Sequence, residues 1–168
     1  MTDITFKTDS GYFIYKAGAI IIHEKKVLMV KNEAHPFYYT VGGRVNFGES
    51  SQAAVLRETF EETGINFEID RLAFIHENFF YDIDSAFDAP AHEIALYYLM
   101  KPLLLSDIES MHCNSLGFGG VKESLHWLPL DKLSEYRLYP EFYKTELLNM
   151  KKEVNHFITK NGNIFCAE

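Results

Sequence analysis

The sequence predicts a single layered α/β domain, and three observations support that prediction. The chain has 168 residues, a length typical of one domain rather than two. Hydrophobic residues make up 47% of it and aromatic residues 15%, enough apolar surface to outweigh the ordering entropy of a compact fold. Segments with strand character outnumber helical ones, and two main helices lie among them, which is the pattern of layered strands and helices.

The first segments of the domain read as strands. Residues 13–22 and 27–30 are apolar and flank the polar stretch HEKK, which predicts a β-hairpin. A short strand, FYYTV at residues 37–41, follows, and the glycine-rich stretch GGRVNFGE at residues 42–49 is predicted to be a loop.

Residues 50–63 are predicted to form a helix of moderate length. Ser50 or Ser51 can cap its first turn, and Gly64 stands where a left-handed C-terminal cap is expected. Each helical residue advances about 100°, so one side carries three carboxylates and the opposite side carries apolar groups. The carboxylate side consists of Glu58, Glu61 and Glu62, and the side expected to pack consists of Ala53, Leu56 and Phe60.

The second half of the chain predicts further strands and one more helix. Residues 67–80 and 92–100 are rich in β-branched, leucine and aromatic side chains, and the acidic stretch between them reads as a loop. SLHWLPL, at residues 124–130, predicts a strand ended by Pro129. Residues 139–154 predict a helix with Pro140 at its first position. Its apolar stripe, expected to be core, is Tyr139, Phe142, Tyr143, Leu147 and Met150.

Charge and cysteine content exclude several classes of function. The formal net charge of −8 disfavours a binder of nucleic-acid polymers or of acidic membrane surfaces, and it means that an anionic substrate needs a cation. No apolar run is long enough to span a membrane, and the N-terminus lacks the pattern of a secretion signal. Cys113 and Cys166 form no metal-binding or disulfide pattern, so a reducing cytoplasm is the expected location.

The three glutamates predict a metal site or a solvated acidic face. Like charges at these spacings cost roughly 0.2 to 0.5 kcal/mol per pair, so the cluster adds no stability by itself. Arg57 lies four residues before Glu61 and can pair with it, but one arginine does not balance three acids. A hard cation such as Mg²⁺ would balance them, because it prefers carboxylate oxygens and keeps positions for waters and substrate phosphates. Considered alone, such a charge run is more often simply solvated.

The residues around the glutamates resemble the Nudix hydrolase box. The stretch GGRVNFGESSQAAVLRETFEETGI has the spacing G-x5-E-x7-R-E-U-x-E-E-x-G-U at residues 43–65, where U is aliphatic. Thr59 departs from the pattern at the first U, and Val41 stands where a proline often precedes the glycines. The resemblance covers residues 12–160 as a single domain. It implies a Nudix-type α/β/α sandwich with a mixed β-sheet and a loop-helix-loop metal site.

The resemblance also implies roles for individual residues. Family members use Mg²⁺ or Mn²⁺ to hydrolyse the diphosphate linkage of a nucleoside diphosphate joined to another group, such as a nucleoside triphosphate, ADP-ribose or a nucleotide sugar. Glu58, Glu61 and Glu62 are then the expected metal ligands, together with the backbone carbonyl of Gly42. Arg57 would orient the carboxylates, and Glu49 would brace the loop against the helix. The general base is Glu58 or Glu93; the alternative for Glu93 is a carboxylate at the start of a strand with no catalytic part.

Outside the box the sequence leaves the substrate open. Phe37, Tyr38, Phe80 and Tyr81 could stack on a nucleobase or belong to the core, and Arg44 and Lys31 could meet phosphates or lie on a solvated surface. The expected partner is a small nucleotide substrate. Dimerisation is common in similar proteins, but no segment demonstrates an interface. The competing interpretation is a Nudix-fold module that binds a nucleotide without cleaving it; such a module would be expected to lack one or more of the acids, and all are present here.

Overall fold

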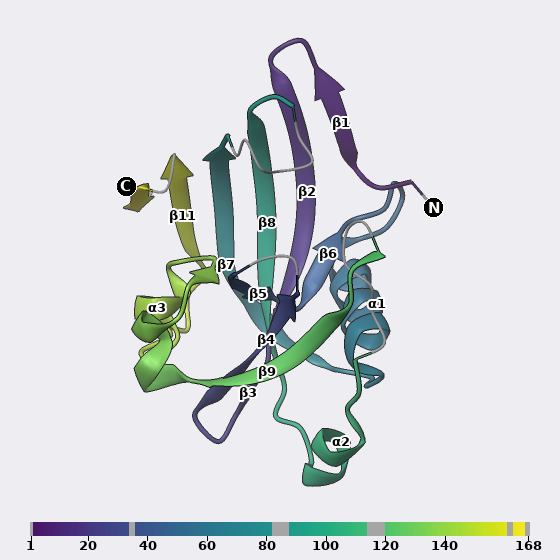
Figure 1. Ribbon diagram of the computed structural model, residues 1–168, viewed down its shortest axis with the longest axis vertical. Coiled ribbons are helices and arrows are strands. Elements are labelled where there is room, and N and C mark those ends of the chain that lie inside the picture. Colours follow the sequence, from purple (N-terminus) through teal and green to yellow (C-terminus); the bar gives the residue numbers. More distant parts are fainter. Residues whose placement is uncertain (1, 34–35, 82–87, 114–119, 161–162, 167–168) are drawn as a thin grey trace.

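The structure is a computed structural model that describes residues 2–33, 36–81, 88–113, 120–160 and 163–166. Two mixed β-sheets cross one another, and the helix α1 (Ser51–Thr63) packs beside them (Figure 1). The α/β fold class predicted from the sequence is confirmed. The mixed sheet expected in the sandwich is divided into two sheets, and the space between these sheets becomes important for the site.

The larger sheet contains seven strands in the order β1-β2-β8-β7-β11-β12, with β6 pairing β2. β2 and β8 are parallel, β8 and β7 are antiparallel, and β7 and β11 are parallel, so the sheet is mixed. Its strands are β1 (Thr5–Thr8), β2 (Gly11–Ile20), β6 (Gly42–Arg44), β7 (Ile69–Phe80), β8 (Ala91–Met100), β11 (Asn155–Lys160) and β12 (Asn163–Cys166).

The smaller sheet contains five strands in the order β10-β5-β4-β3, with β9 pairing β4. These strands are β3 (Ile22–His23), β4 (Lys26–Asn32), β5 (Tyr38–Thr40), β9 (Glu123–Pro129) and β10 (Leu138–Tyr139). Short helices connect the elements: α2 (Leu105–Ser110), a 3-10 helix (Leu130–Glu135) and α3 (Tyr143–Glu146).

The predicted hairpin exists, but its two long strands belong to different sheets. Ile22 pairs with Val27, and the turn between β3 and β4 places Glu24 and Lys25 at φ of 46° and 61°. β2 pairs with β1, β6 and β8 in the larger sheet instead of continuing alongside β4. The end of β2 is fully buried, as expected for an apolar run enclosed on both faces.

The predicted second helix, at residues 139–154, is wrong in extent. Only Tyr143–Glu146 is helical, and Tyr139 belongs to β10, where it pairs with Tyr39 of the parallel strand β5. Pro140 accounts for the extended conformation of Tyr139, because the residue before a proline is driven away from helical conformations. The apolar stripe is core at Phe142, Tyr143 and Leu147, whereas Tyr139 is 42% exposed.

Among the elements of the described residues, the sequence did not predict β1, β6, α2, the 3-10 helix, β10, β11 or β12. β6 lies inside the stretch that was expected to be only a loop, and it pairs Arg44 with Lys16 and Gly42 with Gly18. The strands predicted at residues 67–80, 92–100 and 124–130 are present as β7, β8 and β9. Most of the acidic loop predicted between β7 and β8, residues 82–87, lies outside the described residues.

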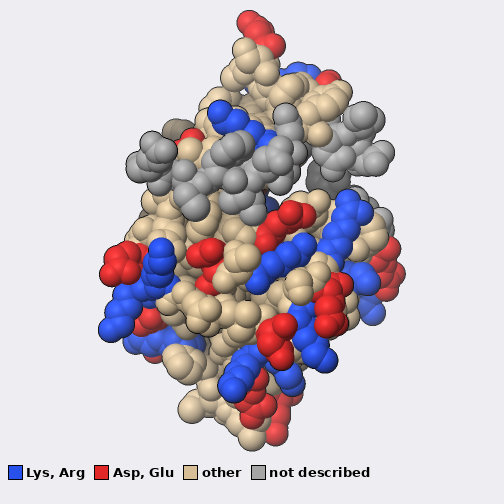
Figure 2. Space-filling model, turned by 90° about the vertical axis from the view of Figure 1, so that its left-hand side faces the viewer, with Lys and Arg blue, Asp and Glu red and all other residues tan. Residues whose placement is uncertain are grey.

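The core has two clusters that fix the relative positions of the sheets. One contains Phe74, Phe142, Tyr143 and Phe157, whose rings contact one another between the sheets and α3. The other joins α1 to β2, β4 and β8. Among the described residues, no helix is long and apolar enough to cross a membrane. On the face in Figure 2, the described basic and acidic side chains alternate without forming a broad patch of either sign.

Candidate active site

The helix α1 begins and ends as the sequence predicts. Ser50 is the N-cap, and its hydroxyl accepts a 3.1 Å hydrogen bond from the backbone N–H of Ala53. Gly64 ends the helix with a left-handed φ of 74°, and its N–H donates to the carbonyl of Phe60. These two caps fix where the carboxylates of the last turns lie.

The face on which α1 packs differs from the predicted face. Ala53 and Phe60 are exposed, whereas Thr59 and Glu62 are buried together with Ala54 and Val55. The prediction was wrong because it assumed that the carboxylate side would face away from the protein. α1 instead turns part of that side toward β6 and β2. Thr59 satisfies its buried hydroxyl by donating to the carbonyl of Val55 at 2.8 Å, so its departure from the aliphatic pattern is accommodated inside the helix.

Arg57 ties the glycine-rich stretch to the helix. Its guanidinium makes two 3.0 Å hydrogen bonds to the carboxylate of Glu49 and one of 3.1 Å to the carbonyl of Arg44. The same group reaches Glu58 at 2.7 Å and Glu61 at 3.4 Å. The hydrogen bonds from Arg57 lower the pKa of Glu49. Glu49 also accepts from the backbone N–H of Asn46, so it holds the loop against the helix.

Glu62 faces inward and is only 6% exposed. Its carboxylate accepts a 3.0 Å hydrogen bond from the backbone N–H of Gly42. Burial raises its pKa well above the ordinary value, and the charges of Glu123 and Glu58 raise it further, while Gly42 and Lys16 act in the opposite sense. Glu123 is itself buried and accepts a short hydrogen bond from the Tyr39 hydroxyl. The carboxyl groups of Glu58, Glu62 and Glu123 are therefore close enough to interact where α1 meets β6.

Gly42 and Gly43 permit this close packing. Gly42 has φ of +135°, and a Cβ there would lie 2.3 Å from the carbonyl oxygen of Ala17. A Cβ on Gly43 would lie 2.5 Å from the carboxylate of Glu58. Burial raises the pKa of Glu58, although Arg57 opposes the shift. Side chains at either glycine would separate the loop from the carboxylates of the helix.

The donor set fits a hard divalent cation. Burial disfavours the charged forms of Glu58 and Glu62, and neighbouring carboxylates add to the effect: Glu61 for Glu58, and Glu123 and Glu58 for Glu62. A cation beside them would reverse both effects. Glu61 is 55% exposed at its side chain and can turn toward them. Within the described part of the chain, no three His, Cys, Asp or Glu side chains already converge on one point. Arg57 hydrogen-bonds to both Glu58 and Glu61. Metal binding would therefore require at least one of these hydrogen bonds to lengthen or break.

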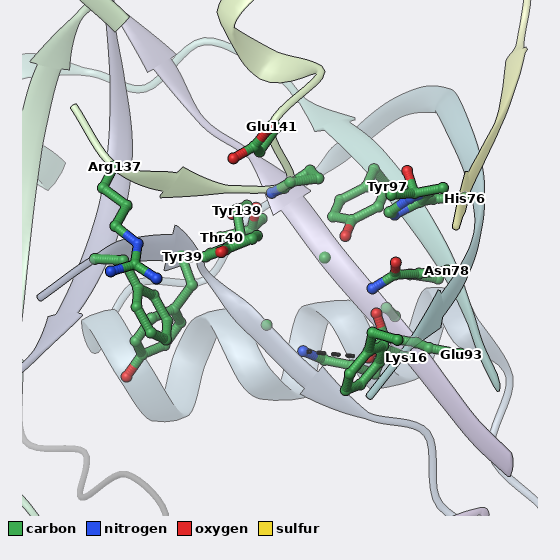
Figure 3. A pocket seen from close by; sticks show the side chains of 18 of the residues that line it. Lys16, Tyr39, Thr40, His76, Asn78, Glu93, Tyr97, Arg137, Tyr139 and Glu141 are labelled. Carbon is green, nitrogen blue, oxygen red and sulfur yellow. Dashed lines mark hydrogen bonds and ion pairs between the residues drawn. The ribbon is translucent and has the colours of Figure 1, made fainter. Parts of the chain in front are cut away.

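A cavity of about 600 Å³ lies next to these glycines, between the two sheets. Gly42, Gly18 and Lys16 line the end nearest α1. Strands β2, β7 and β8 supply one wall, and β5, β10 and the residues around them supply the other (Figure 3). A cavity of this size suits a small-molecule ligand.

Lys16 connects the cavity to the carboxylate cluster. Its ammonium lies 3.9 Å from the carboxylate of Glu93 and favours the charged form of Glu62, although less strongly than burial opposes it. The Glu93 side chain, 13% exposed, lies in the cavity wall and not on the helix (Figure 3). Among the contacts of the described residues, Glu93 meets Lys16 and no residue of the box.

The remaining predicted residues divide between the cavity and the surface. Phe37, Phe80 and Tyr81 line the cavity. Tyr38 does not; its ring packs against Tyr136 and His126. Lys31 lies over the ring of Tyr38 at 5.2 Å, and Arg44 pairs with Asp3 at 3.3 Å. Three of the four aromatic candidates therefore line the cavity. Neither Lys31 nor Arg44, the two basic residues expected to meet phosphates, lines it.

Sequence reasoning missed most of the cavity's polar groups. Lys16, His76, Asn78 and Arg137 line it, and none of them belongs to a motif. The available signal was the alternation of side chains along β7. His76, Asn78 and Phe80 point to the cavity because they share one face of that strand. Recognising this required knowledge of which face of β7 is enclosed.

Comparison with known proteins identifies relatives of both sequence and fold. The family model described as NUDIX domain matches residues 13–146. A putative 8-oxo-dGTP diphosphatase from Bacillus subtilis (strain 168) is 41% identical over 56 residues, covering 32% of this chain and 38% of the relative. A MutT-like protein from Streptomyces ambofaciens is 29% identical over 62 residues, covering 37% and 40%. The matched segments thus span about two fifths of the length of these curated relatives.

The fold also matches solved structures. A MutT protein from Bacillus halodurans superimposes with a TM-score of 0.61 at 19% identity, covering 90% of this chain and 94% of that one. At this identity the match concerns the fold alone. The family model, at residues 13–146, includes the carboxylate helix α1 and the adjoining loop.

Proposed function

Since this chain belongs to the NUDIX domain family of hydrolases, we propose that it is a divalent-cation-dependent pyrophosphohydrolase. Its substrate would be a nucleoside diphosphate linked to another group: a nucleoside triphosphate, ADP-ribose or a nucleotide sugar. One observation carries the proposal. Glu58, Glu61 and Glu62 lie on the last turns of α1, where Glu58 lies against Gly43 and Glu62 against Gly42, next to the cavity that Lys16 lines.

Glu58, Glu61 and Glu62 would hold Mg²⁺, or Mn²⁺ in its place, with the carbonyl of Gly42 as a further ligand. When bound, the cation stabilises charge that builds on the phosphate oxygens and lowers the pKa of coordinated water. Arg57 orients Glu58 and Glu61 through its hydrogen bonds and keeps the loop in place through Glu49. Lys16 is positioned to meet phosphate oxygens between the helix and the cavity.

The proton of the attacking water needs an acceptor, and Glu58 is the first candidate. It lies on α1 against Gly43, beside the expected cation and therefore near the water that would attack. Glu93 is the second candidate. Its ion pair with Lys16 inside the cavity favours a role in binding.

The nucleobase is assigned to the cavity, where Phe37, Phe80 and Tyr81 offer rings for stacking. The Bacillus subtilis relative is named for 8-oxo-dGTP, so that nucleotide belongs in any substrate panel. We expect a cytoplasmic protein that acts on small nucleotides rather than on nucleic-acid polymers or membranes, consistent with its net charge of −8. Homodimerisation is a further expectation.

The test is hydrolysis of a panel of nucleoside triphosphates, ADP-ribose and nucleotide sugars with Mg²⁺, comparing the parent protein with Glu62→Gln. Glutamine preserves the size of the side chain and can still accept from the N–H of Gly42, but it lacks the charge needed by the cation. We expect turnover to fall at least about tenfold, as for loss of a transition-state interaction of 1.4 kcal/mol or more. Glu68→Gln is the matched control, since Glu68 is exposed and pairs with Lys101 outside the site. Equal turnover by the parent and Glu62→Gln would remove the metal role assigned to Glu62.

The alternative function is a nucleotide sensor that binds without cleavage. Retention of Glu58, Glu61 and Glu62 on one helix favours an enzyme. Saturable nucleotide binding without product release, under conditions that include Mg²⁺ and Mn²⁺, would establish the sensor in its place.

A further inference from the structure

Four polar side chains lie along the cavity wall, one on each of four neighbouring strands. Lys16 is on β2, Glu93 on β8, Asn78 on β7 and Thr159 on β11, and all four line the cavity. Asn78 pairs in register with both Glu93 and Thr159, which places the three side chains next to one another across the sheet. We call these four residues the polar row.

The polar row contains hydrogen-bonding groups that the protein leaves unused. The Glu93 side chain is 13% exposed, yet its nearest partner is the Lys16 ammonium at 3.9 Å, beyond the usual hydrogen-bond distance. In the described part of the chain, neither Glu93 nor Asn78 has a side-chain hydrogen bond. Thr159 is already engaged with His76 at 2.8 Å. Partly buried polar groups normally find partners, so Glu93 and Asn78 are placed to receive them from a ligand.

The chemistry of these two groups defines the edge of the ligand. A carboxylate accepts two hydrogen bonds and donates none, whereas an amide both donates and accepts. Glu93 therefore matches two adjacent donors, and the amide of Asn78 can donate to an oxygen beside them. A 2-amino-6-oxopurine presents this sequence: a 2-amino group, N1–H and the 6-oxo oxygen. Adenine has a single amino donor on that edge, next to an acceptor nitrogen that would face the carboxylate.

We propose that the polar row selects guanine-type nucleotides, an inference that rests on the proposed function. Glu93 would accept from N1–H and the 2-amino group, and Asn78 would donate to the 6-oxo oxygen. The aromatic rings on the other side of the cavity would enclose the faces of the base. Tyr139 is one of them (Figure 3), and Phe37 packs edge-on against it. Lys16 is the member of the polar row nearest the carboxylates of α1, on the side where the phosphates must extend. Guanine and its C8-oxidised form share the edge in question, so the polar row would admit both.

The test compares dGTP with dITP, which lacks only the 2-amino group, and with dATP. For the parent protein we expect kcat/KM for dGTP to exceed that for dITP and dATP by at least about tenfold, the discrimination of one good bidentate contact. Glu93→Gln keeps one acceptor and gains a donor that faces the 2-amino group. It should therefore lower kcat/KM for dGTP at least about tenfold, mainly through KM, and reduce the preference over dITP to less than about threefold.

Glu77→Gln is the matched control. Glu77 neighbours Asn78 on β7 but points to the opposite face of the sheet, where it contacts His156 and His92. This substitution should leave the ratio of dGTP to dITP unchanged. A second variant, Asn78→Leu, should reduce the rate for dGTP and dITP alike, because both carry the 6-oxo oxygen, and should spare dATP.

The outcomes separate the inference from the function on which it rests. If no nucleotide is hydrolysed, the proposed function is wrong. The dissociation constants of GMP and IMP, measured without metal, would then still test whether the polar row prefers guanine. Hydrolysis without a preference for dGTP would overturn the inference alone. A Glu93→Gln protein that loses kcat equally on all three nucleotides would also overturn it, since that pattern belongs to a general base.

Discussion

Gly43 controls the distance between the loop and the carboxylate of Glu58. Gly43→Ala would place a methyl group 2.5 Å from that carboxylate, a separation that real side chains do not adopt, so Glu58 must move. We expect hydrolysis to fall at least about tenfold, the effect of losing roughly 1.4 kcal/mol of transition-state stabilisation, while the far-ultraviolet circular dichroism is retained. A double-mutant cycle with Glu58→Gln checks the cause. If the two losses simply multiply, Gly43 does not act through Glu58.

His76 gives the protein a stability that depends on pH. Burial, helped by the charges of His156 and Lys16, lowers the pKa of His76 from about 6.5 to about 4. Between these values the unfolded chain binds a proton that the folded protein does not, so the free energy of unfolding falls as the solution is acidified below pH 6.5. The contribution of His76 should fall by about 2 kcal/mol between pH 7 and pH 5, at 1.36 kcal/mol per pKa unit. Urea denaturation of the parent and His76→Gln at both pH values measures it. Identical losses in the two proteins would contradict this account.

At the residue scale, the sequence predicted the groups that belong to one contiguous pattern. Arg57, Glu49, Glu58 and Gly64 have the contacts or backbone conformation expected from their spacing, because all of them depend on one helix and the loop before it. The ligand roles of the glutamates and the part played by Glu93 stay predictions. Asn78 could not be found this way, since its place in the cavity depends on the pairing of distant strands.

The cap of α1 sets the stability of the element that carries the carboxylates. Ser50→Ala removes the hydroxyl that accepts from Ala53 and leaves that N–H without a partner in the first turn. The expected cost is about 1 kcal/mol of unfolding free energy. Chemical denaturation measures it, with Ser106→Ala on the exposed side of α2 as the control that should change stability by less than about 0.5 kcal/mol. A cost at Ser50 no larger than at Ser106 would show that the cap is not needed.

At the element scale, local signals predicted where α1 begins and ends but not which face it buries. The helical wheel separated apolar from acidic residues correctly, yet Phe60 is 49% exposed and Glu62 is 6% exposed. The backbone N–H of Gly42 supplies a partner that makes burial of Glu62 tolerable, and that partner comes from another element. Tyr139 was misassigned for a related reason, because it pairs with β5 in a sheet that sequence periodicity did not reveal.

The whole molecule should become more stable when the cation binds, since binding only to the folded state shifts the unfolding equilibrium. At a cation concentration ten times the dissociation constant, the gain is about 1.4 kcal/mol, which for a domain of this size corresponds to a rise in Tm of a few degrees. Differential scanning calorimetry with Mn²⁺ or Mg²⁺ measures the rise, and Glu62→Gln should abolish most of it. A Tm that is unchanged by the cation would favour the interpretation of a solvated acidic face.

At the scale of the fold, the division into two sheets creates the cavity and could not be read from the chain. The hairpin prediction gave the turn at Glu24 and Lys25 but did not reveal that β2 and β4 diverge into separate sheets. That divergence leaves room between β2, β7 and β8 on one side and β5 and β10 on the other. The proposed chemistry and its selectivity therefore meet along β2, which carries Lys16 and pairs with both β6 and β8.

The central claim is that the last turns of α1 hold a divalent cation against the phosphates of a nucleotide. The most direct measurement is anomalous scattering from Mn²⁺ in crystals of the Glu58→Gln or parent protein grown with a non-hydrolysable nucleoside triphosphate. The account predicts an anomalous peak in the parent within coordination distance of Glu58, Glu61 or Glu62 and of a phosphate oxygen, and a weaker peak in the variant. A peak elsewhere, with all three carboxylates directed into solvent, would contradict it.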